Sequence, residues 1–199
     1  MTVIEQLMVD IKSTGILELL AVITGLTYVL LASQKVRLCW WFAMFSTASY
    51  AVLCIHENLY LESSLQLFYF IMAVYGWLEW TKDKKIDLPI VRWPAKYHLF
   101  NVVGSTVVSL IMGWLMDNFT DQDQPYLDAF TTVFSLLATF MVAKRVLENW
   151  LYWIFIDLGL VVLYSSKGFV LTGIQYFIFT VVAIFAFWSW YKLYKTQEN

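Results

Sequence analysis

Seven apolar runs dominate this sequence, and each is long enough to cross the roughly 30 Å hydrocarbon core of a bilayer. They cover residues 14–32, 38–55, 61–81, 99–116, 127–142, 147–165 and 169–194. Only 14% of the residues are charged, whereas soluble domains carry about a quarter. Because backbone groups in lipid must be paired within each span, the runs predict transmembrane helices. We therefore expect an all-α membrane protein and exclude a soluble enzyme or a nucleic-acid-binding protein.

The basic residues predict the orientation of these helices. Eleven of the 13 Lys and Arg residues lie in the first, third and fifth connections or near the C-terminus, and only Lys12 and Lys167 lie on the other side. Cytoplasmic loops of membrane proteins carry the excess of Lys and Arg. The N-terminus is therefore expected outside and the C-terminus in the cytoplasm. Residues 1–13 are either a short amphipathic helix on the outer membrane surface or a polar leader.

A weak internal repeat relates the first three helices to the last three. A shift of 110 residues aligns Lys35 with Arg145, Trp40 with Trp150, and Trp80 with Trp190. The shift spans four helices, so the two triplets share one orientation and the helix at 99–116 is expected to link them. We therefore expect one transmembrane domain over residues 1–199, with three-helix repeats at 14–81 and 127–194. Parallel repeats with a site between them are typical of transporters.

The helix at 147–165 carries an acid, Asp157, near the middle of the bilayer. A carboxylate there costs roughly 2.5–3.5 kcal/mol, so it is expected to face a cavity or a partner. The same helix face carries Trp150, either Trp153 or Ile154, and Tyr164, and Asn149 lies one position to the side. This pattern predicts a ligand site, with helix packing through a protonated Asp157 as the alternative.

Two further helices offer polar and aromatic side chains for the same site. Gln66, Tyr69 and Tyr75 lie in the helix at 61–81, and Gln175 and Tyr176 lie in the last helix. No Lys or Arg occurs in the middle of any span. An acid among aromatic rings, with no basic partner, suits a flat cationic ligand, because each ring face attracts a cation by roughly 0.5–2 kcal/mol.

Motifs for catalysis, metal binding and nucleotide binding are absent from the sequence. It contains no His-x-x-x-His, no Gly-x-Ser-x-Gly and no glycine-rich phosphate loop. His56 and His98 lie at membrane edges without ligand-like spacing around them. We therefore expect no enzymatic activity, no cofactor and no metal, and transport would be driven by a gradient or by a partner.

Several motifs resemble those of the PnuC family of bacterial vitamin transporters. They are Leu65-Gln66-Leu67-Phe68-Tyr69, Tyr75-Gly76-Trp77-Leu78-Glu79-Trp80, and Glu148-Asn149-Trp150-Leu151-Tyr152-Trp153 followed by Asp157. The resemblance covers almost the whole chain. It implies two parallel three-helix bundles joined by a linker helix, in the bacterial inner membrane. It also implies facilitated diffusion of a vitamin precursor, which a cytoplasmic kinase then traps as a phosphate.

Within this family, the sequence looks more like the PnuT branch, which takes thiamine. Riboside-type members commonly have an Asn two residues before the Tyr-Gly-Trp motif, where this chain has Ala73. Thiamine is therefore the expected substrate and nicotinamide riboside the alternative; both carry a fixed positive charge on a flat ring. Alternatives of other classes are a proton-coupled transporter that uses Asp157 and a membrane scaffold that transports nothing.

Overall fold

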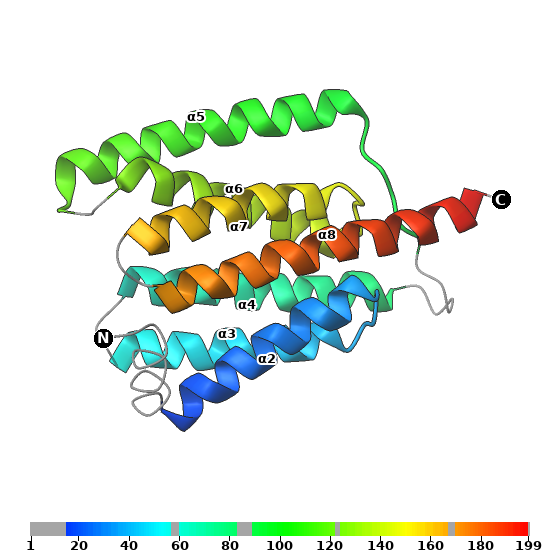
Figure 1. The fold of residues 1–199 in the computed structure, drawn as a ribbon, viewed down its shortest axis with the longest axis horizontal. Helices are drawn as coiled ribbons and strands as arrows, with labels where there is room; N and C mark the ends of the chain where they lie inside the picture. The colour runs from blue at the N-terminus through cyan, green and yellow to red at the C-terminus, as the bar shows by residue number, and fades with distance from the viewer. Residues whose placement is uncertain (1–14, 57–59, 83–88, 122–123, 167–169, 199) are drawn as a thin grey trace. The chain divides into compact units, whose positions relative to one another are not determined.

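Each predicted span corresponds to one helix of the computed structural model, which describes residues 15–56, 60–82, 89–121, 124–166 and 170–198 (Figure 1). The helices are α2 (Ile16–Ser33), α3 (Cys39–His56), α4 (Tyr60–Thr81), α5 (Ala95–Phe119), α6 (Pro125–Ala143), α7 (Asn149–Ser166) and α8 (Val170–Glu198). Most observed bounds differ from the predicted ones by one or two residues. The exceptions are α5, which is longer at both ends than the predicted 99–116, and α8, which continues to Glu198. The expectation for residues 1–13 lies outside the described residues.

In the described part of the chain, five helices are long and apolar enough to cross a membrane. They are α2, α3, α5, α6 and the Gly173–Gln197 part of α8. The apolar part of α7, Asn149–Ser165, is slightly shorter. The helix α4 contains acids, among them Glu79, which lower its hydropathy. The prediction of an all-α membrane protein is confirmed, and its orientation stays a prediction.

The chain divides into two units, with the boundary between Leu88 and Pro89. In the first unit α2 packs on α3 and α3 packs on α4. In the second unit α5 packs on α6, α6 on α7, and α7 on α8, and Figure 1 shows α5 (green) alongside α6. The helix expected as a linker therefore packs with the second bundle.

The helices α2 and α6 end in the same kind of turn. Lys35 and Arg145 have left-handed backbone conformations, with φ angles of 59° and 58°. In each turn this residue and the next donate their N–H groups to carbonyl oxygens of the last helical turn, at 2.9 Å in all four bonds. This is the Schellman arrangement, which satisfies carbonyl groups that the helix end leaves unpaired. The two turns lie 110 residues apart, so the backbone repeats at the spacing seen in the sequence.

Each unit also contains an edge-to-face pair of buried tryptophans. The ring centroids of Trp40 and Trp80 are 5.3 Å apart at 89°, and those of Trp150 and Trp190 are 5.5 Å apart at 87°. All four side chains are buried. Such pairs contribute about 0.5–1.5 kcal/mol beyond the area that they bury. They join α3 to α4 in the first unit and α7 to α8 in the second.

The helix α6 is packed between α5 and α7 within the second unit. Its buried positions include the small residues Ala129, Thr131, Ser135, Ala138 and Thr139. Small residues let helices approach closely, which is how helices associate in lipid. One close contact with α7 lies at Gly159, where an added Cβ atom would be 3.2 Å from the methyl group of Thr131. Gly159 therefore lies on the face of α7 that packs against α6.

Candidate functional site

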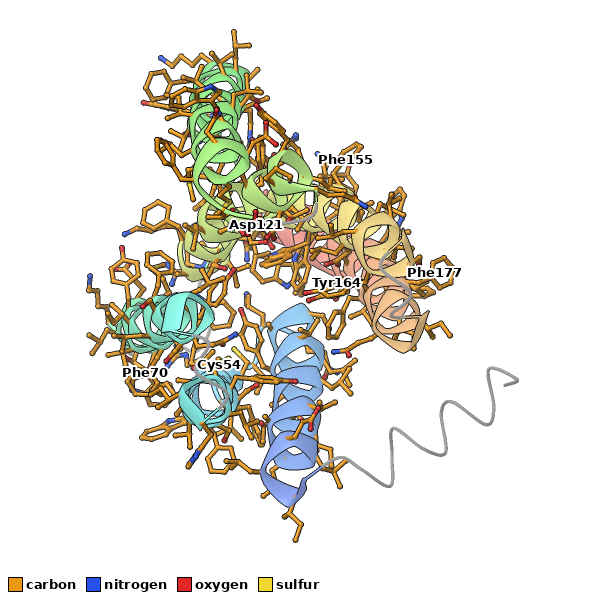
Figure 2. All side chains as sticks on the ribbon, turned by 90° about the vertical axis from the view of Figure 1, so that its left-hand side faces the viewer. Cys54, Phe70, Asp121, Phe155, Tyr164 and Phe177 are labelled. Atoms are coloured by element: carbon orange, nitrogen blue, oxygen red, sulfur yellow. The ribbon has the colours of Figure 1, made fainter. Side chains whose placement is uncertain are left out.

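The helix α7 has one exposed face and one buried face. Leu151, Phe155, Leu158 and Val162 are exposed and follow each other at steps of three and four residues. Such a stripe is the face that a helix turns toward lipid. Figure 2 shows Phe155, and Phe177 of α8, on the outer side of the second unit and away from Tyr164. A ligand site inside the protein would therefore lie on the opposite, buried face of α7.

Asp157 lies on the buried face, with 4% of its surface exposed. Among the residues that the structure describes, no hydrogen bond or ion pair reaches its carboxyl group. No Lys or Arg occurs in α7, or in α8 before Lys192. An unpaired buried carboxylate is costly. The position is therefore suited to a cationic ligand or to a proton.

Tyr164 and Tyr176, predicted from different helices, stack on each other. Their ring centroids are 5.4 Å apart and their planes are inclined by 13°. Phe179 meets the Tyr176 ring edge to face, with the centroids 5.9 Å apart. Gln175, half-buried, precedes Tyr176 in α8. The structure thus brings together two of the predicted aromatic residues, Tyr164 of α7 and Tyr176 of α8.

Asn149 and Trp150 occupy the first turn of α7, and both are buried. The Asn149 amide donates a hydrogen bond from Nδ2 to the carbonyl oxygen of Val146, at 2.6 Å. Within the described residues, Oδ1 of Asn149 and Nε1 of Trp150 are buried without a hydrogen-bond partner, as is Nε1 of Trp40 in the first unit. Buried polar atoms are usually paired, so Asn149 carries an unmet acceptor and Trp150 an unmet donor within the described residues. The predicted contact of these two residues with a ligand stays a prediction.

Trp153 faces a different neighbour. Its half-buried ring packs against the cluster of Phe134, Ala138 and Ile156 between α6 and α7. The structure therefore gives Trp153 a packing contact, and its predicted contact with a ligand stays a prediction.

The other predicted site residues belong to the first unit. Gln66, Tyr69 and Tyr75 of α4 are all half-buried. The Tyr69 ring meets Phe68 edge to face, with centroids 6.0 Å apart. Ala73, on the same helix, is buried. The part that these α4 residues play in ligand binding stays a prediction.

A cluster around Glu148 was not foreseen from the sequence, which marks Glu148 only as part of a motif. Its carboxylate accepts a hydrogen bond of 2.7 Å from Nε of Arg92, 56 residues away. This bond to Glu148 raises the pKa of Arg92 above its usual value, so the guanidinium stays charged. Residues so far apart leave no local pattern, and only the path of the chain before α5 brings them together.

Metal ligands do not gather in the described part of the chain. No group of three or more His, Cys, Asp or Glu side chains there could hold a metal ion.

Helices that are long and apolar enough to cross a membrane, with a buried acid in α7, define a membrane protein. The chain belongs to the PnuC family, since the family model described as nicotinamide mononucleotide transporter matches residues 15–192. It is therefore a transporter and not an enzyme, and its expected location in the bacterial inner membrane is confirmed.

Curated relatives and a solved structure are similar to this chain. It is 24% identical over 196 residues to the nicotinamide riboside transporter PnuC of Escherichia coli strain K12, covering 84% of this chain and 82% of the relative. It is 24% identical over 128 residues to the riboflavin/roseoflavin transporter RibM of Streptomyces davaonensis, covering 60% and 59%. A crystal structure of the vitamin B3 transporter PnuC matches with a TM-score of 0.75 at 21% identity, covering 96% of this chain and 87% of that one. This last likeness shows the fold.

Proposed function

We propose that this transporter carries a flat, positively charged vitamin precursor across the inner membrane by facilitated diffusion, and that nicotinamide riboside is its substrate. The E. coli relative, which is similar over 84% of this chain, is named for this riboside. Thiamine, expected from Ala73, becomes the second candidate because the two curated relatives are named for nicotinamide riboside and riboflavin.

The observation that carries the proposal is Asp157, a buried acid of α7 without a partner among the described residues. A ring with a fixed positive charge would balance this carboxylate. Trp150 lies two helical turns before Asp157 and Tyr164 lies two turns after it, so one helix face offers aromatic rings on both sides of the acid. Cations bind over such rings with about 0.5–2 kcal/mol each.

The remaining contacts are assigned by chemistry. Tyr164 and Tyr176 would stack on the flat ring of the substrate. The amides of Asn149 and Gln175 would bind its polar edge, and Oδ1 of Asn149 is buried and unpaired within the described residues. Gln66, Tyr69 and Tyr75 of α4 are proposed as further binding residues, and alanine variants of each test them separately.

The sequence contains no motif for an energy source, so the proposed transport is driven by the substrate gradient. A facilitator only equilibrates its substrate, so accumulation needs a second step. We propose that a cytoplasmic kinase supplies this step, since a phosphorylated product is charged differently and is no longer the transported molecule.

Thiamine stays the second candidate because of one position. Ala73 is buried in α4 and has no polar side-chain atom, whereas riboside-type members commonly have an Asn there. An alanine cannot donate a hydrogen bond to a ribose hydroxyl.

The proposal is tested by titrating the purified protein with nicotinamide riboside, thiamine and riboflavin, with binding heat as the readout. We expect saturation by nicotinamide riboside and at least tenfold weaker binding of uncharged riboflavin, since a charged hydrogen bond or pair is worth roughly 1.5–3 kcal/mol. Saturation by thiamine alone would establish the second candidate.

The role of Asp157 is tested in the same titration. Asp157→Asn keeps the shape of the side chain but removes the charge, and we expect it to weaken riboside binding. Asp121→Asn is the matched control, because Asp121 is an exposed acid outside the membrane-spanning helices. Equal affinity of Asp157→Asn and the unmodified protein would refute the assigned role.

A further inference from the structure

The segment at 89–94, which precedes α5, lies along the turn between α6 and α7. The Val91 N–H group donates to the carbonyl oxygen of Arg145 at 3.0 Å, and the Leu147 N–H group donates to the carbonyl oxygen of Val91 at 2.8 Å. These two bonds form a parallel bridge between Val91 and Val146. The turn before α7 is therefore bound by a second piece of backbone.

The start of this segment is held by two further hydrogen bonds. The Ile90 N–H group donates to Oε1 of Gln197 in α8, at 3.1 Å. Nε of Arg145 donates to the carbonyl oxygen of Pro89, also at 3.1 Å. The segment is thus tied to α8 and to the α6–α7 turn within the second unit.

Glu148 is the centre of this arrangement, with 8% of its surface exposed. It accepts hydrogen bonds from Nε of Arg92 at 2.7 Å and from the Trp93 N–H group at 3.4 Å. Nε2 of His98, in α5, lies 3.7 Å from Oε2 of Glu148, the oxygen that accepts the Trp93 N–H group. Nδ1 of His98 lies 3.0 Å from the Tyr152 hydroxyl of α7. The carboxylate of Glu148 therefore joins the 89–94 segment, α5 and the start of α7.

The backbone of Glu148 leads directly into the candidate site. Its carbonyl oxygen accepts the N–H groups of Leu151 and Tyr152, at 3.0 and 3.4 Å. Asn149 and Trp150 lie between these bonded positions, in the first turn of α7. A restraint on Glu148 is therefore a restraint on the two residues of α7 that carry unpaired buried polar atoms.

The first unit shows that the turn itself does not need this carboxylate. The residue 110 positions before Glu148 is Leu38, which is 51% exposed. The turn before Leu38 has a left-handed residue, Lys35, at the position that Arg145 occupies before Glu148. The N–H groups of both turns bond to helix carbonyl groups in the same way. Burying a charge is costly unless the charge is paired. The cluster at Glu148 thus adds a restraint that backbone geometry alone does not explain.

We infer that Glu148 is a positioning residue, which with Arg92 holds the first turn of α7 so that Asn149 and Trp150 are placed for substrate binding. The inference rests on the proposed function insofar as it assigns the substrate to α7. Glu148 itself acts through its neighbours and is not assigned a contact with the substrate.

The test compares three variants of the cluster with a control in the first unit. Arg92→Ala and Glu148→Gln remove the ion pair, whereas Arg92→Lys keeps a cation opposite Glu148. Leu38→Gln is the control at the corresponding position. The readouts are KM and Vmax for nicotinamide riboside in proteoliposomes, and hydrogen exchange of the amides in the first turn of α7.

We expect Arg92→Ala and Glu148→Gln to raise KM roughly tenfold with little change in Vmax. This is the pattern when a variant weakens substrate binding equally in every state of the transport cycle. The same variants should speed amide exchange at Leu151 and Tyr152. Arg92→Lys should largely restore both values, and Leu38→Gln should change neither. If Glu148 and Arg92 had a merely structural role, the variants would instead lower Vmax and the thermal stability, and KM would not rise at constant Vmax.

Unchanged exchange at the start of α7 in Arg92→Ala and Glu148→Gln would overturn the inference, as would a fall in Vmax at constant KM. The exchange measurement needs no substrate. If the unmodified protein equilibrates no riboside, the proposed function fails while exchange still decides whether Glu148 positions α7.

Discussion

Gly76 of α4 lies directly against the indole ring of Trp40 in α3: a Cβ atom at this glycine would be 2.4 Å from Cη2 and Cζ2 of the ring. No side chain larger than hydrogen fits there without moving the ring, which also meets Trp80 edge to face. The residue 110 positions later, Ala186, is buried in α8. Each unit therefore has a tryptophan pair, with a glycine against the ring in the first unit and a buried alanine at the corresponding position of the second.

Gly76→Ala is expected to destabilise the protein by about 1–3 kcal/mol, the usual range for overpacking a buried site. The new methyl group would force Trp40 away from Trp80. Thermal unfolding in detergent measures the effect. Gly104→Ala in α5 is the control, because nothing lies within 4 Å of a Cβ atom there. Equal unfolding temperatures for the two variants would contradict the contact.

Trp190→Ala should lower the stability far more than Trp188→Ala. Trp190 is buried against Trp150, and truncating a buried tryptophan costs about 3–5 kcal/mol. Trp188 is 56% exposed, so its ring is expected to lie in lipid. Unfolding curves of the two variants in the same detergent provide the comparison. A larger loss in Trp188→Ala would show that the faces of α8 are assigned the wrong way round.

Tyr164→Ala and Tyr176→Ala should each weaken riboside binding, and the double variant should lose less than the sum of the two. Stacked residues act as a unit, so their effects are not additive. Calorimetric titration of the three variants gives the coupling free energy. Phe177→Ala is the control on the exposed face of α8. Additive losses would mean that the two rings do not bind the substrate together.

Proteoliposomes with an imposed pH gradient should equilibrate nicotinamide riboside without accumulating it. A facilitator cannot move its substrate uphill, whatever the protonation state of Asp157. The internal and external concentrations at steady state are the measurement. Uphill accumulation that a protonophore abolishes would instead support the proton-coupled alternative.

The C-terminus should lie in the cytoplasm, so a reporter that works only in the cytoplasm should be active when it is fused there. The expected orientation rests on the positive-inside rule, with eleven of the 13 Lys and Arg residues on one side. A pair of reporters, one active inside and one active outside the inner membrane, gives a positive signal for either orientation. Activity of the outside reporter would reverse the topology.

Much of the fold was predictable because it depends on local chemistry. Apolar runs in lipid have to form helices, so the seven helices of the described chain appeared in the sequence with bounds close to those observed. The repeat was visible because identical turn and tryptophan positions recur at one spacing, as Lys35 and Arg145 do. The packing of α5 against α6 could not be predicted, because the sequence of a helix between two repeats does not indicate which helix it packs against.

For the candidate site, helix periodicity alone placed Trp150, Asp157 and Tyr164 on one face of α7, because a rotation of 100° per residue needs no tertiary information. The partners of these residues depended on the packed structure. Tyr176 stacks on Tyr164, and Arg92 reaches Glu148, only because helix rotation and the path of the 89–94 segment bring distant residues together. Local sequence sets how a helix is built and which face is polar, but contacts between elements follow from the packing of all of them at once.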